Sequence, residues 1–180
     1  MLVSPEFATW VVSGIDPRGG PTDSRSEPER FAEHEREVMN RTNGIRAAGG
    51  RLNLPWPQRF GTPPWGAEKE LEDGAARAGA RYTMRLVRLS SSAALREAHR
   101  DLVSRVHEGL PALLYIGNTR LPRHVTLVLP ASGPAGEAQL DVYDPATGSV
   151  TDLDPDRFAG KTLGIAGWNV PWITVQPSAS

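Results

Sequence analysis

The stretch that decides the fold is Gly109–Leu129, GLPALLYIGNTRLPRHVTLVL, which is followed by Gln139–Val150, QLDVYDPATGSV. The first contains two short apolar runs separated by a polar turn, a pattern typical of neighbouring buried strands. In the second, apolar and polar residues alternate up to DPATG, where Asp and Gly favour a turn. A further apolar run, PWITV, covers Pro171–Val175. The sequence therefore predicts a sheet of mostly antiparallel strands, with a hairpin at DPATG.

Upstream of these strands the apolar residues recur at helical spacing. Capping residues and breakers predict four helices. The first two cover about Ser4–Ser13 and Pro28–Thr42. The third has Thr62 as its N-cap and runs to about Ala78, and the fourth has Ser91 or Ser92 as its N-cap and ends at Gly109. Between the third and the fourth, Arg81–Leu89 alternates and predicts a strand with one solvated face. Helices first and strands afterwards are typical of an α+β fold.

The apolar positions of these helices predict which side chains face the core. In the second helix the inner face is expected to carry Phe31, His34 or Glu35, Val38 and Met39. In the fourth, the apolar positions are Leu95, Ala98, Leu102, Val103 and Val106.

Composition limits the domain organisation and the partners. The 180 residues carry 20 Lys and Arg against 21 Asp and Glu, with a formal net charge of −1, and this even composition favours one domain over 1–180. The predicted elements make this domain helical over about 4–108 and a sheet over about 110–177. Without an excess of basic residues a nucleic-acid partner is not expected. Since the chain has no apolar run of membrane-spanning length and no visible secretion signal, we expect a cytoplasmic protein without a membrane partner. The oligomeric state is left open.

The sequence contains four histidines and no cysteine. Three of them lie on predicted helices among Glu and Arg, and we expect their side chains to be solvated: His34, His99 and His107. Their spacing does not match a zinc helix, and we expect neither a metal nor another cofactor.

His124 differs from the other histidines because it stands at the head of an apolar strand, where a rigid element holds it. An Asp bonded to one ring nitrogen would leave the other free to accept a proton. Asp144, at the end of the strand in LDVYD, is the candidate for this role, since alternation places Asp141 on the other face. The alternative is that His124 only begins a strand and Asp144 only opens a turn.

The order GLPALLYIG, RHVTLVL and LDVYDPATGSV, within Leu110–Leu153, resembles the C-terminal half of papain-like cysteine peptidases of the bacterial kind that process double-glycine leaders. The resemblance implies a papain-like fold, with the helical first half packed on the sheet. It also implies His124 as catalytic base, Asp144 as its orienter, and a peptide or protein substrate. In that family the nucleophile is a Cys at the start of a central helix, close to an oxyanion donor.

The sequence departs from the family because it has no Cys. Three explanations stay open: the Cys precedes Met1 in a longer peptidase, which the abrupt apolar start favours; the chain is a pseudoenzyme; or the resemblance is one of fold alone, as in a peptide- or protein-binding module. Capping explains Ser4, Ser13 and Ser90–Ser92 better than a nucleophilic role does. Local backbone bonding explains Asn118 and Gln58 better than an oxyanion role.

Four tryptophans lie near prolines in LPWPQRFGTPPWG and AGWNVPW, and are candidates for gripping an extended peptide. They are Trp56, Trp65, Trp168 and Trp172. The alternative is that they anchor long loops to the core.

Overall fold

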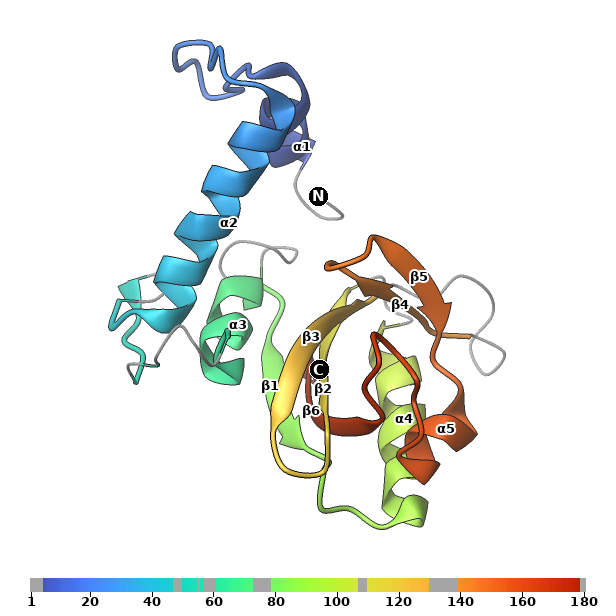
Figure 1. Cartoon of the computed structure of the whole chain (residues 1–180). Coiled ribbons are helices and arrows are strands. Elements are labelled where there is room, and N and C mark those ends of the chain that lie inside the picture. The colour runs from blue at the N-terminus through green and yellow to red at the C-terminus, as the bar shows by residue number, and fades with distance from the viewer. Residues whose placement is uncertain are drawn as a thin grey trace. The chain divides into compact units, whose positions relative to one another are not determined.

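The computed structural model describes residues 5–46, 50–54, 56, 61–72, 79–106, 110–129 and 139–178. It divides into two compact units, unit 1 over Met1–Gly79 and unit 2 over Ala80–Ser180. The described part of unit 1 contains helices α1 (Pro5–Ser13), α2 (Glu27–Asn43) and α3 (Pro64–Glu70). Unit 2 contains the sheet with α4 (Ser92–Val106) and α5 (Pro155–Gly160) (Figure 1). Helices and an antiparallel sheet together make this an α+β protein, as predicted.

The two helices α1 and α2 form close to their predicted bounds, but the expected inner face of α2 is only partly confirmed, since His34 and Val38 are half-buried. Phe31 and Met39 are 42% and 40% exposed. The buried residues of α2 include Arg30, whose Nε donates to the carbonyl of Val11 at 2.9 Å and whose Nη2 donates to the carbonyl of Val12 at 3.0 Å. A guanidinium that satisfies the last carbonyls of α1 can be buried, and amphipathic spacing alone does not reveal such a contact.

The third helix is shorter than predicted. Its N-cap is Pro63 and not Thr62, and the α-helix ends at Glu70. The expected end, Ala78, lies outside the described residues. In unit 1, Arg41 and Glu70 form an ion pair that joins α2 to α3.

The sheet of unit 2 has six strands in the order β1-β6-β2-β3-β4-β5, and each neighbouring pair is antiparallel. The strands are β1 (Tyr82–Leu86), β2 (Ala112–Gly117), β3 (Pro122–Val128), β4 (Asp141–Asp144), β5 (Ser149–Asp152) and β6 (Val170–Pro177). The last strand is therefore inserted between β1 and β2. As predicted, DPATG connects a hairpin, here of β4 and β5, and Gly148 at its end has a φ of +71°.

In β1 the expected alternation of burial is wrong. Tyr82 is buried, but Met84 and Leu86 are 43% and 56% exposed. Their register partners on β6 are Val175 and Ile173, so these two apolar side chains lie on the face of the sheet opposite to Leu114.

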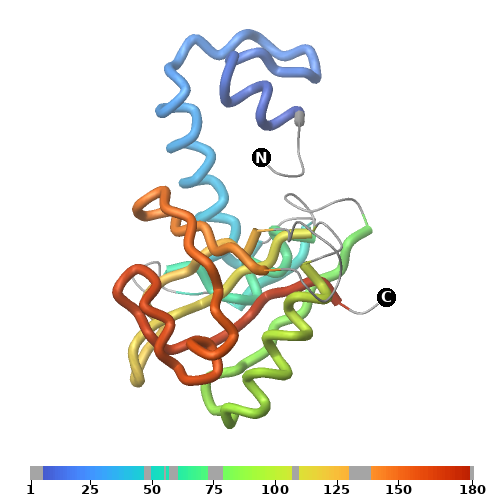
Figure 2. The backbone as a smooth tube through the Cα atoms, turned by 90° about the vertical axis from the view of Figure 1, so that its right-hand side faces the viewer, coloured from blue at the N-terminus to red at the C-terminus, as the bar shows by residue number. Residues whose placement is uncertain are grey.

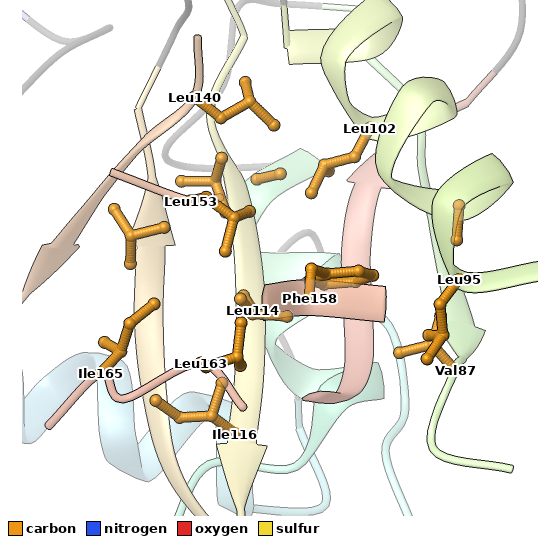
Figure 3. Close-up of a cluster of buried hydrophobic side chains, with 14 of the residues drawn as sticks. Val87, Leu95, Leu102, Leu114, Ile116, Leu140, Leu153, Phe158, Leu163 and Ile165 are labelled. Atoms are coloured by element: carbon orange, nitrogen blue, oxygen red, sulfur yellow. The ribbon is translucent and has the colours of Figure 1, made fainter. Parts of the chain in front are cut away.

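The main core of unit 2 lies between the sheet and its two helices (Figure 3). The apolar positions predicted for α4 are confirmed, since Leu95, Ala98, Leu102 and Val106 are buried and Val103 packs against them. They meet residues from β2, β3, β4 and α5, among them Leu114, Ile116, Val128, Val142 and Phe158. Complete burial of so many aliphatic side chains is the main stabilising contribution to this unit.

The helix α5 is not among the predicted elements. Asp154 is its N-cap and accepts a hydrogen bond of 2.7 Å from the backbone N–H of Arg157, with Pro155 in the first turn. Between α5 and β6 the chain doubles back in a tight loop, where Ile165 and Trp168 pair through two backbone hydrogen bonds (Figure 2).

Candidate functional site

The strands β3 and β4 bring the two candidate catalytic residues together. His124 lies opposite Ile116 of β2, and Asp144 shares a face with Val142, which is opposite Val128. Alternation then places His124, Val128 and Asp144 on one face of the sheet. Nε2 of His124 lies 2.6 Å from Oδ1 of Asp144.

Hydrogen bonds hold the Asp144 carboxylate in place. The residue is 3% exposed, and Oδ1 also accepts from the backbone N–H of Ala146 at 2.9 Å, while Oδ2 accepts from the Thr147 hydroxyl at 2.9 Å. Desolvation raises the pKa of Asp144, but the hydrogen bonds from Ala146, His124 and Thr147 together outweigh it and hold this pKa below its ordinary value. Asp144 is therefore ionised near neutral pH and can only accept hydrogen bonds.

This arrangement determines the role of each nitrogen of the His124 ring. Because Asp144 can only accept, Nε2 of His124 carries a hydrogen, and in the neutral ring Nδ1 then carries the lone pair. Within the described part of the chain, no group hydrogen-bonds to Nδ1. The His124 side chain is 19% exposed, so solvent reaches it. The pair can thus accept a proton at Nδ1 while Asp144 stabilises the resulting imidazolium.

The sequence did not single out Thr147, although it belongs to the DPATG turn. Its hydroxyl donates to Asp144 and also lies 2.7 Å from the hydroxyl of Ser149. An Asp followed three residues later by Thr in a turn is a local signal for such a bond. Asp141, the competing acid, is exposed at the other end of β4.

The turn between β2 and β3 adjoins His124 and is tightly built. The Asn118 Oδ1 accepts from the backbone N–H groups of Arg120 and Leu121 at 2.8 and 2.9 Å, so this side chain serves the local backbone. A Cβ on Gly117 would lie 2.2 Å from the carbonyl oxygen of Leu121, so only glycine fits there. Gln58, the other residue considered as an oxyanion donor, lies outside the described residues.

The four tryptophans occur in both units. In unit 1, Trp56 and Trp65 meet edge to face with ring centroids 5.1 Å apart, and Nε1 of Trp65 donates to the carbonyl of Leu54 at 3.2 Å. In unit 2, Trp168 is half-buried against the core. Nε1 of Trp172 donates to the carbonyl of Asn118 at 2.9 Å, which ties β6 to the turn beside His124.

The remaining histidines do not share one environment. The prediction that His99 is solvated is wrong: it is 7% exposed, and its Nε2 lies 2.9 Å from the carbonyl oxygen of Leu153. His34 is half-buried, and its ring centroid lies 4.2 Å from that of Phe7. His107 lies outside the described residues.

Two of the serines considered as nucleophiles, Ser13 and Ser91, have local structural roles. Ser13 donates to the carbonyl of Thr9 at 2.7 Å, and the Ser91 hydroxyl accepts from the backbone N–H of Ala94 at the start of α4. Ser4 lies outside the described residues. Within the described ranges, no three His, Asp or Glu side chains gather in a group that could hold a metal ion.

No described helix has the length and apolar character needed to cross a membrane. Comparison with known proteins found no match to the chain among family models, curated proteins or solved structures.

Proposed function

We propose that unit 2 is a papain-like domain of the cysteine-peptidase type, in which His124 is the general base and Asp144 its orienter in the hydrolysis of a peptide or amide bond. The observation that supports this most is the 2.6 Å contact between Nε2 of His124 and the buried carboxylate of Asp144. It leaves Nδ1 as the proton acceptor, on a side chain that solvent reaches.

The proposed reaction requires a thiol from outside these 180 residues, because they contain no cysteine. Nδ1 of His124 would take the thiol proton, and the thiolate would attack the carbonyl carbon to form a tetrahedral oxyanion. The proton would then pass to the leaving amine as the C–N bond breaks, leaving a thioester that water hydrolyses. Throughout, Asp144 would stay ionised and stabilise the imidazolium.

The test is the hydrolysis of a fluorogenic peptide mixture by the native polypeptide isolated from its source. Treatment with iodoacetamide is expected to abolish the activity, and His124→Gln is expected to lower it at least about a hundredfold. His34→Gln is the matched control and is expected to retain activity. Hydrolysis that survives both iodoacetamide and His124→Gln contradicts the proposal.

The absence of cysteine from the sequence favours a second candidate, a non-catalytic module that binds a peptide or protein through the same surface. His124→Ala separates the two functions. Lost hydrolysis with unchanged peptide binding supports the enzyme, whereas impaired binding without hydrolysis in any form supports the module.

A further inference from the structure

The end of unit 2 next to His124 carries four cationic residues, which we call the cationic end: Arg88, Arg120, Arg123 and Lys161. Arg120 belongs to the turn between β2 and β3, and Arg123 directly precedes His124. Both are exposed. Arg88 follows β1, and Lys161 follows α5.

Hydrogen bonds connect the segments that carry these cations. The guanidinium of Arg88 lies over the ring of Trp172 at 4.8 Å and also donates to the carbonyl of Thr119 in the turn. Nζ of Lys161 donates to the carbonyls of Arg88 and Ser90 at 2.9 and 3.1 Å. The cationic end is therefore a fixed structure in which segments far apart in sequence meet.

The carboxylate nearest to the cationic end in the described site is Asp144, whose oxygens are directed to His124, Ala146 and Thr147 and not to the four cations. Residues 79–91, 110–129 and 161–172 contain no Asp or Glu. Among the described residues of unit 2, other arginines do pair with carboxylates, such as Arg85 with Asp101 and Arg96 with Asp156. None of the four cations forms an ion pair with a described carboxylate.

The cationic end adjoins the candidate catalytic pair. In the register of β2 with β3, Gly117 pairs with Pro122 next to the turn. The neighbouring pair, one step further from the turn, is Ile116 with His124. Arg120 is therefore four residues from His124, across a turn that Asn118 holds rigid. A polypeptide that reaches Nδ1 of His124 past this turn would lie within range of its positive potential, because exposed charges act over about 10 Å at moderate ionic strength.

We infer that the site takes an anionic polypeptide, with carboxylates on the segment that lies along the cationic end next to His124. This inference rests on the proposed function, because it names the substrate class of that site. Arg120 is the best-placed recognition residue, since its side chain is exposed and unpaired within the described part of the chain.

The test is an NMR titration of the whole chain, observing the His124 imidazole and the Trp172 indole N–H. The probes are a blocked octapeptide of alternating Ala and Glu, its counterpart with Gln in place of Glu, and the Gln peptide with a free C-terminal carboxylate. The Glu peptide is expected to bind with a Kd about five- to tenfold lower than the blocked Gln peptide. This difference should shrink at about 0.5 M salt.

Arg120→Glu is expected to abolish the preference for the Glu peptide, whereas the matched control Arg100→Glu, on exposed α4 surface, should keep it. If only the Gln peptide with a free C-terminal carboxylate binds more tightly than the blocked Gln peptide, the recognised anion is a chain terminus. If the Glu peptide binds more tightly, the recognised anions are side-chain carboxylates. Either result supports the inference.

Three outcomes overturn it. Equal affinity for the Glu and both Gln peptides, with shifts at His124, overturns the charge preference and leaves the proposed function standing. A single-stranded oligonucleotide that shifts the same signals at lower concentration than the Glu peptide identifies a nucleic-acid surface instead. If no peptide shifts His124, the inference fails, whereas the proposed function fails only if the native polypeptide does not hydrolyse the fluorogenic peptides.

Discussion

Nε2 of His99 lies 2.9 Å from the backbone carbonyl oxygen of Leu153, and this contact joins α4 to the chain between β5 and α5. The His99 ring also meets Phe158 edge to face, with centroids 5.7 Å apart. Leu153 is a buried residue directly after β5, so its carbonyl needs a donor, and here a helix side chain supplies it. The contact fixes α4 against the segment between β5 and α5, across 54 residues of sequence.

We expect His99→Ala to lower the free energy of unfolding of unit 2 by about 2–4 kcal/mol, because it removes buried ring contacts and leaves the Leu153 carbonyl without its donor. The measurement is a denaturant titration followed by the amide signals of β2 and β3. The neighbouring exposed Arg100→Ala should change stability by less than about 0.5 kcal/mol. Equal effects of the two variants would contradict this role for His99.

The pKa of Asp144 predicts how the stability of unit 2 depends on pH. Because this pKa is lower in the folded protein than its ordinary value of 3.8, the folded form binds fewer protons than the unfolded form over the interval between them. The stabilisation is therefore complete above the ordinary value and is lost as the pH falls through the lowered pKa. Asp144→Asn should make the acid side of the stability profile shallower in denaturant titrations at a series of pH values. An unchanged acid slope would contradict the prediction.

Thr147→Val tests the hydroxyl that donates to Oδ2 of Asp144. Valine keeps the shape of the side chain but removes the donor, so the pKa of Asp144 should rise towards its ordinary value. The measurement is an NMR titration of the Asp144 carboxyl carbon. Thr151→Val, at an exposed position of β5, is the matched control and should leave the titration unchanged.

Substitutions at two turn positions are expected to change the free energy of unfolding in opposite directions. Ala166 has a φ of +50°, which is costly for a residue with a Cβ, so Ala166→Gly should stabilise unit 2 by about 0.5–1 kcal/mol. Gly148 has a φ of +71°, and an added Cβ would meet no atom within 4 Å. Gly148→Ala should therefore destabilise by about 1 kcal/mol through the backbone alone. Denaturant titration of both variants measures the sign of each change in the free energy of unfolding. Changes of the same sign in the two variants would contradict this role of the positive φ angles.

The parts of the fold that the sequence predicted are those set by short-range patterns. The hairpin at Asp144–Gly148 follows from turn residues between alternating segments, and α4 follows from apolar spacing over fifteen residues. The same alternation places Asp144, and not Asp141, on the face of Val142. Bringing Asp144 to His124 needed only the pairing of β3 with β4, two consecutive strands.

The parts that were missed depend on contacts between distant segments. Burial of His99 requires the carbonyl of Leu153, and burial of Arg30 requires the carbonyls at the end of α1. The cationic end likewise forms only when Trp172 and Lys161 reach the turn and the end of β1. The helix α5 did carry a local signal, Asp154-Pro155, but it has only six residues.

The insertion of β6 between β1 and β2 sets the order in which unit 2 can assemble. Val175 is the register partner of both Met84 and Leu113, so β1 has no place in the sheet until β6 is present. During synthesis β6 leaves the ribosome last of these strands. About ninety residues must therefore be translated after β1 before β1 can pair with β6. The sheet therefore closes only after translation of β6, and until then the backbone groups of β1 that pair with β6 have no partner strand.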